Sequence, residues 1–222
     1  MAVQARQRLL AAAGELFYSE GVRAVGLERL LEESGVGRAS FYRHFAGKDE
    51  LVAAMLDDYD AEYRTWLRAR VGELGHEPLA VFDAVAERAE STAFRGCAFI
   101  NTMAEITDPA DPIHTRAAAH KAAVTDYLAE LLTSADAKSA DRLARRWMLL
   151  LDGAVVTASY LKNVHAFAEA KSIARADLAA QSPKPPHHAS DGTGDRSRRR
   201  GAVSAPEVHT CRATPGTSFK SE

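Results

Sequence analysis

Apolar residues recur every three or four positions along most of the first 180 residues, and strand-like alternation is scarce. This period is typical of amphipathic helices that bury one face. In the stretch 3–19, the residues on that face are Leu9, Leu10, Ala13, Leu16 and Phe17. The pattern therefore predicts an all-α protein.

Interruptions by glycine and proline divide this pattern into separate helices. We expect helices over 3–19, 48–74, 79–92, 98–106, 113–132, 139–161 and 166–180, with two shorter ones inside 27–45. The long helix over 48–74 carries an apolar stripe that includes Tyr59, Tyr63 and Trp66. It connects an N-terminal group of three short helices to the rest of the chain.

The stretch 27–45 has the layout of a helix-turn-helix. Its first helix carries leucines on one face, Gly35 suits the positive φ of a sharp turn, and Phe41 and Phe45 lie one turn apart. The second helix then points polar side chains outward, and in a helix-turn-helix this helix enters the DNA major groove. The outward residues are Arg38, Ala39, Ser40, Tyr42, Arg43 and His44.

Two kinds of DNA contact are expected from this face. Arg38 suits guanine edges or phosphate, and Ala39 or Ser40 can touch a thymine methyl or a base edge. Tyr42 and His44 can reach phosphate oxygens, which positions a protein without reading sequence. The alternative reading of the same spacing is a helical hairpin with a solvated basic face.

Lys48 begins the long helix, where its charge and the helix N-terminus can both address a phosphate. Several arginines add to a basic face near it. They are Arg6, Arg8, Arg23, Arg38 and Arg43.

Residues 4–51 resemble the DNA-binding domain of the TetR/AcrR family of transcriptional regulators. The matching segments are 10–17, 20–22, 30–36 and, most specifically, Ser-Phe-Tyr-Arg-His-Phe-Ala-Gly-Lys-Asp-Glu-Leu over 40–51. The resemblance implies that Tyr42 and Lys48 hold phosphates. It places Arg38, Ala39, Ser40 and His44 at or near the bases.

Two glycines depart from the family pattern. Gly26 stands where Thr or Ser is usual, and Gly37 stands where Ser or Thr is frequent. Glycine keeps a backbone suited to a helix cap but lacks the hydroxyl. The missing hydroxyls leave open a second hypothesis, a protein-interaction module that has lost DNA binding.

The resemblance implies a DNA-binding domain over 1–50 and a helical effector-binding and dimerisation domain over 51–180. We expect a repressor that binds palindromic operator DNA as a homodimer and is released by a small molecule. A dimer of this kind places its recognition helices about 34–36 Å apart, one turn of DNA.

Effector and dimer residues are expected among the later helices, because helix bundles hold ligands between facing helices. The aromatic and aliphatic side chains there indicate a largely apolar effector. The expected pocket residues are Phe99, Asn101, Met103, Glu105, Trp147 and Leu151. The expected dimer residues are Leu143, Leu150, Ala154, Ala158 and Leu161.

Composition narrows the class of protein. The 222 residues carry a net charge of −2 and are 46% hydrophobic, so the chain is globular, and any basic face is local. No segment is apolar enough for a membrane span or a signal peptide. The chain has only two cysteines, Cys97 and Cys211. Together these features indicate a cytoplasmic protein with reduced thiols.

No enzyme signature is present. The sequence lacks a phosphate-binding glycine loop, a nucleophile elbow and a metalloprotease histidine pair. His114 and His120 are six residues apart, which is not the spacing of a helical zinc pair, and we expect neither metal nor cofactor. Cys97 is expected to be a small core residue, with a redox-sensing thiol as the alternative.

After residue 180 the chain becomes rich in Pro, Gly, Ser, Thr and charge. A segment of this composition cannot bury enough apolar surface to fold alone. We therefore expect 181–222 to be a disordered tail. Its arginine run at 196–200 is expected to be solvated, with an auxiliary DNA-binding arm as the alternative.

Overall fold

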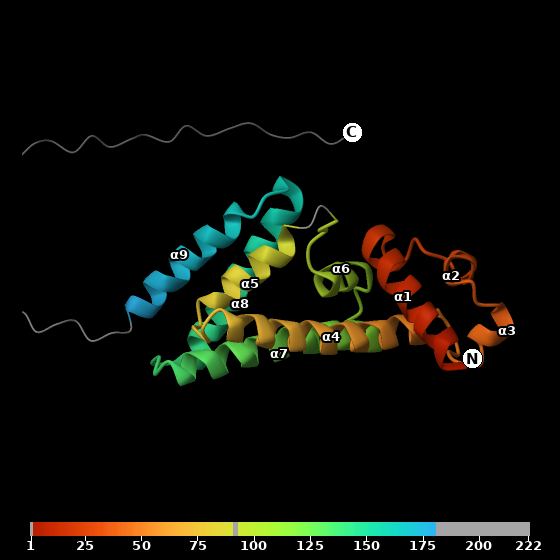
Figure 1. Cartoon of the computed structure of the whole chain (residues 1–222), viewed down its shortest axis with the longest axis horizontal. Coiled ribbons are helices and arrows are strands. Elements are labelled where there is room, and N and C mark those ends of the chain that lie inside the picture. Colours follow the sequence, from red (N-terminus) through yellow and green to blue (C-terminus); the bar gives the residue numbers. More distant parts are fainter. Residues whose placement is uncertain (1, 91–92, 181–222) are drawn as a thin grey trace, which may run out of the picture. The chain divides into compact units, whose positions relative to one another are not determined.

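The computed structural model describes residues 2–90 and 93–180. The predicted disordered tail, its arginine run and Cys211 lie outside this range. The described residues form helices and no strand, which confirms the all-α prediction. The helices are α1 (Ala2–Glu20), α2 (Leu27–Ser34), α3 (Arg38–Phe41), α4 (Lys48–Glu73), α5 (Ala80–Ala89), α6 (Ala98–Glu105), α7 (Pro112–Ser134), α8 (Ala140–Leu161) and α9 (His165–Ala179) (Figure 1).

The turn of the helix-turn-helix has the geometry expected from its glycine. Gly35 ends α2 with φ 59° and ψ 28°, in the left-handed region. Its N–H donates to the carbonyl of Glu32 and the N–H of Val36 donates to the carbonyl of Leu31, both at 3.3 Å, which satisfies the end of the helix. By contrast, Gly26 and Gly37 are the N-cap residues that precede α2 and α3. Both have extended backbone, and neither provides a side-chain cap.

The first hydrophobic core, here called the N-terminal cluster, is not confined to α1–α3. It contains Leu9, Leu30 and Phe41 from these helices, all fully buried. Leu51, Val52 and Leu56 from the first turns of α4 extend it, and so do Phe99 of α6 and Ile113 and Ala117 of α7. The N-terminal helices α1–α3, here called the head, therefore share their core with the helices that follow them.

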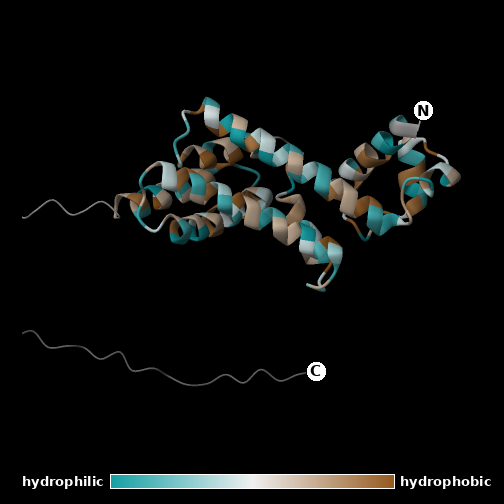
Figure 2. Ribbon diagram, turned by 90° about the horizontal axis from the view of Figure 1, so that it is seen from below, coloured by the Kyte–Doolittle hydropathy of each residue, from teal (hydrophilic) through white to brown (hydrophobic). Residues whose placement is uncertain are grey.

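The second core, the C-terminal cluster, lies among α4, α5, α7, α8 and α9. Trp147 and Phe82 are fully buried there, with their rings edge to face and 5.7 Å between centroids. Helix α8 packs against both α7 and α9. Hydrophilic and hydrophobic residues are interspersed along the helices, as amphipathic packing requires (Figure 2).

Within the described residues, no helix combines the length and the apolar character that crossing a membrane needs.

Helix α6 holds the turn between α1 and α2. The carboxylate of Glu105 accepts hydrogen bonds from the backbone N–H of Val22 at 3.1 Å and of Arg23 at 2.7 Å. The turn begins at Gly21, whose φ is +97°, and a Cβ placed there would lie 2.8 Å from Glu105 Oε1. The backbone conformation favours glycine, and a Cβ would in addition displace the Glu105 carboxylate.

We predict that Gly21→Ala lowers the free energy of unfolding by about 1–3 kcal/mol, because alanine strains the positive φ and displaces Glu105. Chemical denaturation of the full chain measures the change. Gly14→Ala is the matched control, since no atom lies within 4 Å of a Cβ there and Gly14 is inside α1. It should raise stability by about 0.5–1 kcal/mol. Equal effects of the two substitutions would contradict this account.

Candidate functional site

The outward face of the helix-turn-helix is formed as the sequence predicts. Phe41 and Phe45 are buried in the N-terminal cluster, with 5.9 Å between their ring centroids. The polar residues of the face are turned away from them. Arg38, Ala39, Tyr42 and Arg43 are exposed, whereas Ser40, His44 and Lys48 are half-buried.

Arg38 forms an ion pair with Glu28 of α2. Both side chains are more than half exposed, at 57% and 75%. Exposed pairs contribute little stability and are screened by salt. Arg38 can therefore exchange this partner for another anion at small cost.

Lys48 is tied to the head by its ammonium group. Its Nζ donates to the carbonyl of Val25 at 2.8 Å and lies 6.0 Å from the centre of the Phe17 ring. An ammonium group has three N–H donors, so this bond leaves two. The half-buried Lys48 is thus fixed at the start of α4 while two of its N–H donors remain available to bind a phosphate.

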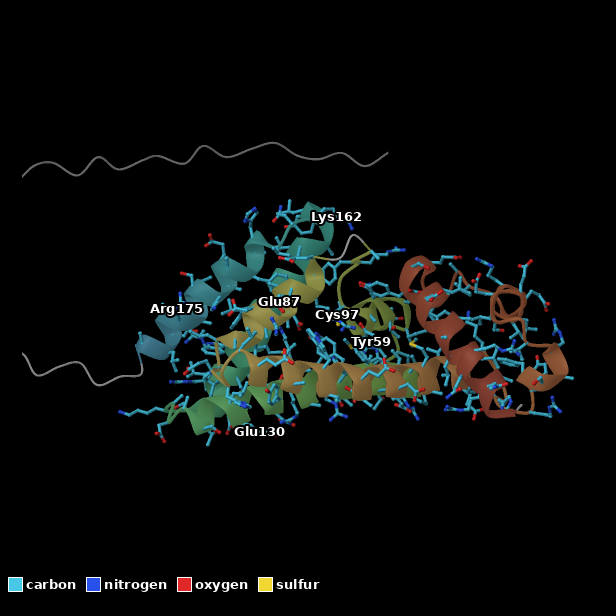
Figure 3. All side chains as sticks on the ribbon, viewed as in Figure 1. Tyr59, Glu87, Cys97, Glu130, Lys162 and Arg175 are labelled. Carbon is cyan, nitrogen blue, oxygen red and sulfur yellow. The ribbon has the colours of Figure 1, made fainter. Side chains whose placement is uncertain are left out.

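Outside the helix-turn-helix, the described residues line a cavity of about 270 Å³, here called the main cavity. Figure 3 labels two residues of its wall, Tyr59 of α4 and Cys97, which immediately precedes α6. Most of the remaining wall is apolar and includes Val85, Phe94, Phe99, Val124, Met148, Leu151 and Val155. Its polar residues include Tyr18, Tyr63, Arg88, His120, Lys121 and Asp152.

A second cavity of about 310 Å³ lies beside the first and next to the DNA-binding head. Tyr18, Tyr59, Arg88 and Ala98 line both cavities. Tyr18 of α1 also joins the head to the cavity wall, because its hydroxyl donates to the carbonyl of Gly96 and accepts from the N–H of Arg95. The two cavities are therefore adjacent and share walls with α1.

The residues expected to form one effector pocket are divided between two cavities and two hydrophobic clusters. Phe99 and Leu151 line the main cavity, and Asn101 and Glu105 line the second cavity. Trp147 lines neither, because it is fully buried in the C-terminal cluster. Met103 also lines neither and packs against the N-terminal cluster.

Sequence reasoning missed most of the polar wall of the main cavity. Tyr18, Arg88, Lys121 and Asp152 come from four helices that are distant in sequence, so spacing alone does not connect them. Tyr63 was attributed to the apolar stripe of α4. Cys97, expected in the core, is half-buried at the cavity.

His120 is held in a neutral state within the wall of the main cavity. Burial lowers its pKa to about 4, although the hydrogen bond to Asp60 opposes the shift. Its Nδ1 lies 2.7 Å from Asp60 Oδ1. Burial also pushes the pKa of Asp60 upward, but hydrogen bonds from Arg64 and His120 outweigh it and leave that pKa below its usual value. Asp60 is thus the charged acceptor, and the proton of His120 is assigned to Nδ1.

The residues expected at a dimer interface differ in their exposure. Leu143, Ala154 and Ala158 are buried within the chain, at 0%, 4% and 3% exposure. They have almost no surface left for a partner. Leu150 is half-buried and Leu161 is exposed.

A different set of apolar side chains is exposed on α8. Leu149, Val156 and Tyr160 are 75%, 46% and 66% exposed. Spacings of seven and four residues place them on one face of the helix. Ile173 of α9 is also half exposed.

We predict that the free energy of unfolding falls as pH decreases from about 6.5 to about 4, because the unfolded chain protonates His120 and the folded chain does not. In His120→Gln this loss should shrink by on the order of 2 kcal/mol. Urea denaturation at several pH values measures it. His165→Gln, at an exposed histidine, is the control and should keep the wild-type profile. An unchanged slope in His120→Gln would refute the assignment.

Comparisons with known proteins agree with the geometry of the head. Residues 9–55 match the family model described as bacterial regulatory proteins, tetR family. The regulator TtgR of Pseudomonas putida is 31% identical over 118 residues, 47% of this chain, and this match covers 56% of TtgR. The chain thus spans little more than half of that relative.

Structural similarity extends over nearly all the described residues. The crystal structure of SCO4454, a TetR-family transcriptional regulator from Streptomyces coelicolor, aligns with a TM-score of 0.72 and 34% identity. The alignment covers 81% of this chain and 96% of SCO4454. With the exposed helix-turn-helix face, this similarity establishes that the chain belongs to the TetR family of DNA-binding transcriptional regulators, which are not enzymes.

Proposed function

We propose that the chain is a repressor that binds palindromic operator DNA as a homodimer and is released by a small molecule in the main cavity. The observation that carries the proposal is a single helix, α6, that connects this cavity to the DNA-binding head. Cys97, just before the helix, lines the main cavity, and Glu105 at its end holds the α1–α2 turn. The division into a head over 1–50 and an effector domain over 51–180 is part of this proposal.

On DNA, the exposed α3 face enters the major groove. Arg38, Ala39, Ser40 and His44 lie at or near base edges, and Arg43 adds positive charge. Tyr42 and Lys48 contact phosphates, which fixes the register. The exposed ion pair with Glu28 keeps Arg38 available, because DNA can replace that carboxylate.

The homodimer forms through α8 and α9. Support comes from the exposed face of Leu149, Val156 and Tyr160 on α8 and from Ile173 on α9. Leu150 and Leu161 flank this face on α8. Exposed apolar patches of this kind mark association surfaces.

Sedimentation velocity tests the dimer directly, and a monomer at micromolar concentration contradicts it.

Release follows from a conformational equilibrium. A ligand shifts it only if it binds the DNA-incompetent arrangement better than the competent one. Phe99 belongs to the N-terminal cluster and also lines the main cavity, so a ligand that displaces its ring changes the packing of the head. Glu105 transmits the same movement to Val22 and Arg23.

We predict a division of roles on the DNA-binding face. Purified protein binds a fragment from immediately upstream of its own coding region more tightly than scrambled DNA, and more weakly as salt rises. Tyr42→Phe, which removes only the hydroxyl, weakens both DNAs by a similar factor. Arg38→Ala reduces the ratio between them by about tenfold, because a base contact contributes about 1–3 kcal/mol of discrimination. Gel shifts at two salt concentrations measure these effects.

Glu28→Gln is the control, since it removes the competing carboxylate and leaves Arg38 in place. It should raise affinity at low salt. Equal loss of discrimination in Tyr42→Phe and Arg38→Ala contradicts the division of roles. No binding at low salt, even to random DNA, favours the interaction module that the missing hydroxyls at Gly26 and Gly37 leave open.

A further inference from the structure

Among the described residues, the main cavity contains a cation that has no anionic partner. Arg88 of α5 has no carboxylate oxygen within 4 Å among the described residues, although it lines both cavities. The other two charged groups of the main cavity neutralise each other, because Lys121 Nζ lies 2.5 Å from Asp152 Oδ1. The carboxylates of Glu15 and Glu105 line the second cavity and not the main one. The main cavity is therefore electrically positive.

Aromatic residues hold the Arg88 guanidinium in place. Its Nη2 donates to the hydroxyl of Tyr59 at 3.1 Å, and its central carbon lies 5.7, 5.4 and 4.8 Å from the ring centres of Tyr59, Tyr63 and Trp66. A guanidinium group has five N–H donors in a planar fork that matches a carboxylate. Tyr59 takes one of them. The remaining donors are oriented before any ligand arrives.

The walls beside Arg88 are suited to a flat ring. The imidazole of His120 is stacked on Phe99, with 3.6 Å between centroids and 8° between planes. Tyr63 meets the same imidazole edge to face at 5.1 Å, and Tyr59 lies tilted 5.6 Å from Phe99. Aromatic ligands bind such surfaces in offset or edge-to-face contact.

Among the ring side chains of this wall, two polar atoms have no hydrogen-bond partner in the described part of the chain. They are the hydroxyl of Tyr63 and Nε2 of His120, whose Nδ1 is bound to Asp60. His120 is only 4% exposed. Tyr63 offers a donor, and the neutral imidazole offers an acceptor for a hydroxyl on the ligand.

We propose that the effector is a small aromatic acid, with its ring against Phe99, Tyr59 and Tyr63 and its carboxylate on Arg88. This rests on the proposed function as a ligand-responsive regulator and specifies the class of its ligand. The cavity of about 270 Å³ lies just below the ~300–1,000 Å³ typical of ligand pockets, which suits a small ligand of one or two fused rings. The unpaired Arg88 disfavours aromatic cations.

The test compares three probes of equal ring size on the full chain by calorimetry: 2-naphthoate, neutral 2-naphthamide and cationic 2-naphthylmethylammonium. We expect 2-naphthoate to bind at least tenfold more tightly than the other two. Arg88→Gln should weaken 2-naphthoate at least tenfold and change 2-naphthamide less than twofold. Arg142→Gln is the matched control and should change neither affinity, because the side chain of this exposed arginine of α8 makes no hydrogen bond or ion pair within the described residues.

Three results overturn the proposal: equal or tighter binding of the amide or the ammonium, no binding of any probe, or 2-naphthoate affinity unchanged in Arg88→Gln. Melting temperatures of each variant establish that it is folded. DNA affinity is measured separately on the ligand-free protein. If the protein binds 2-naphthoate selectively but binds no DNA, the ligand class is supported and the role as a regulator is contradicted. If it binds DNA but none of the three probes, the role as a regulator is supported and the ligand class is contradicted.

Discussion

The packing of Phe99 is the contact on which the proposed coupling between the main cavity and the DNA-binding head depends. Its ring is 1% exposed and belongs to the core of the DNA-binding head, yet it also lines the main cavity and stacks on His120. Close-packed cores respond to displacement by repacking and not by continuous deformation. A change in the cavity at this ring therefore reaches the head directly.

The polar contacts around α6 reinforce this connection. Glu105 holds the α1–α2 turn, and Tyr18 joins α1 to the backbone at Arg95 and Gly96 in the wall of the cavity. The bonds to the Val22 N–H and the Gly96 carbonyl are partly buried, and breaking them leaves polar groups without a partner, which costs free energy. The head and the cavity wall thus have a limited set of compatible arrangements, which is what a ligand-controlled equilibrium requires.

The helices and the helix-turn-helix could be predicted from sequence because local rules determine them. Gly35 is in the left-handed conformation that its turn requires, and Phe41 and Phe45 are buried as their spacing indicates. The cavity could not be predicted in the same way. Trp147 and Leu151 lie one turn apart on α8, yet only Leu151 reaches the main cavity. Arg88 becomes a candidate ligand contact only when packing brings α4 and α5 together. The apolar face of α8 that stays exposed is likewise determined by packing, because α7 and α9 cover the rest of the helix.

The most direct test of the shared core compares two fully buried phenylalanines. Phe99→Leu and Phe82→Leu remove similar volume, but Phe99 belongs to the N-terminal cluster and Phe82 to the C-terminal cluster. DNA affinity is measured for both variants at a temperature where both are folded. The account predicts a severalfold loss of affinity in Phe99→Leu and no change in Phe82→Leu. Equal affinities in the two variants contradict it.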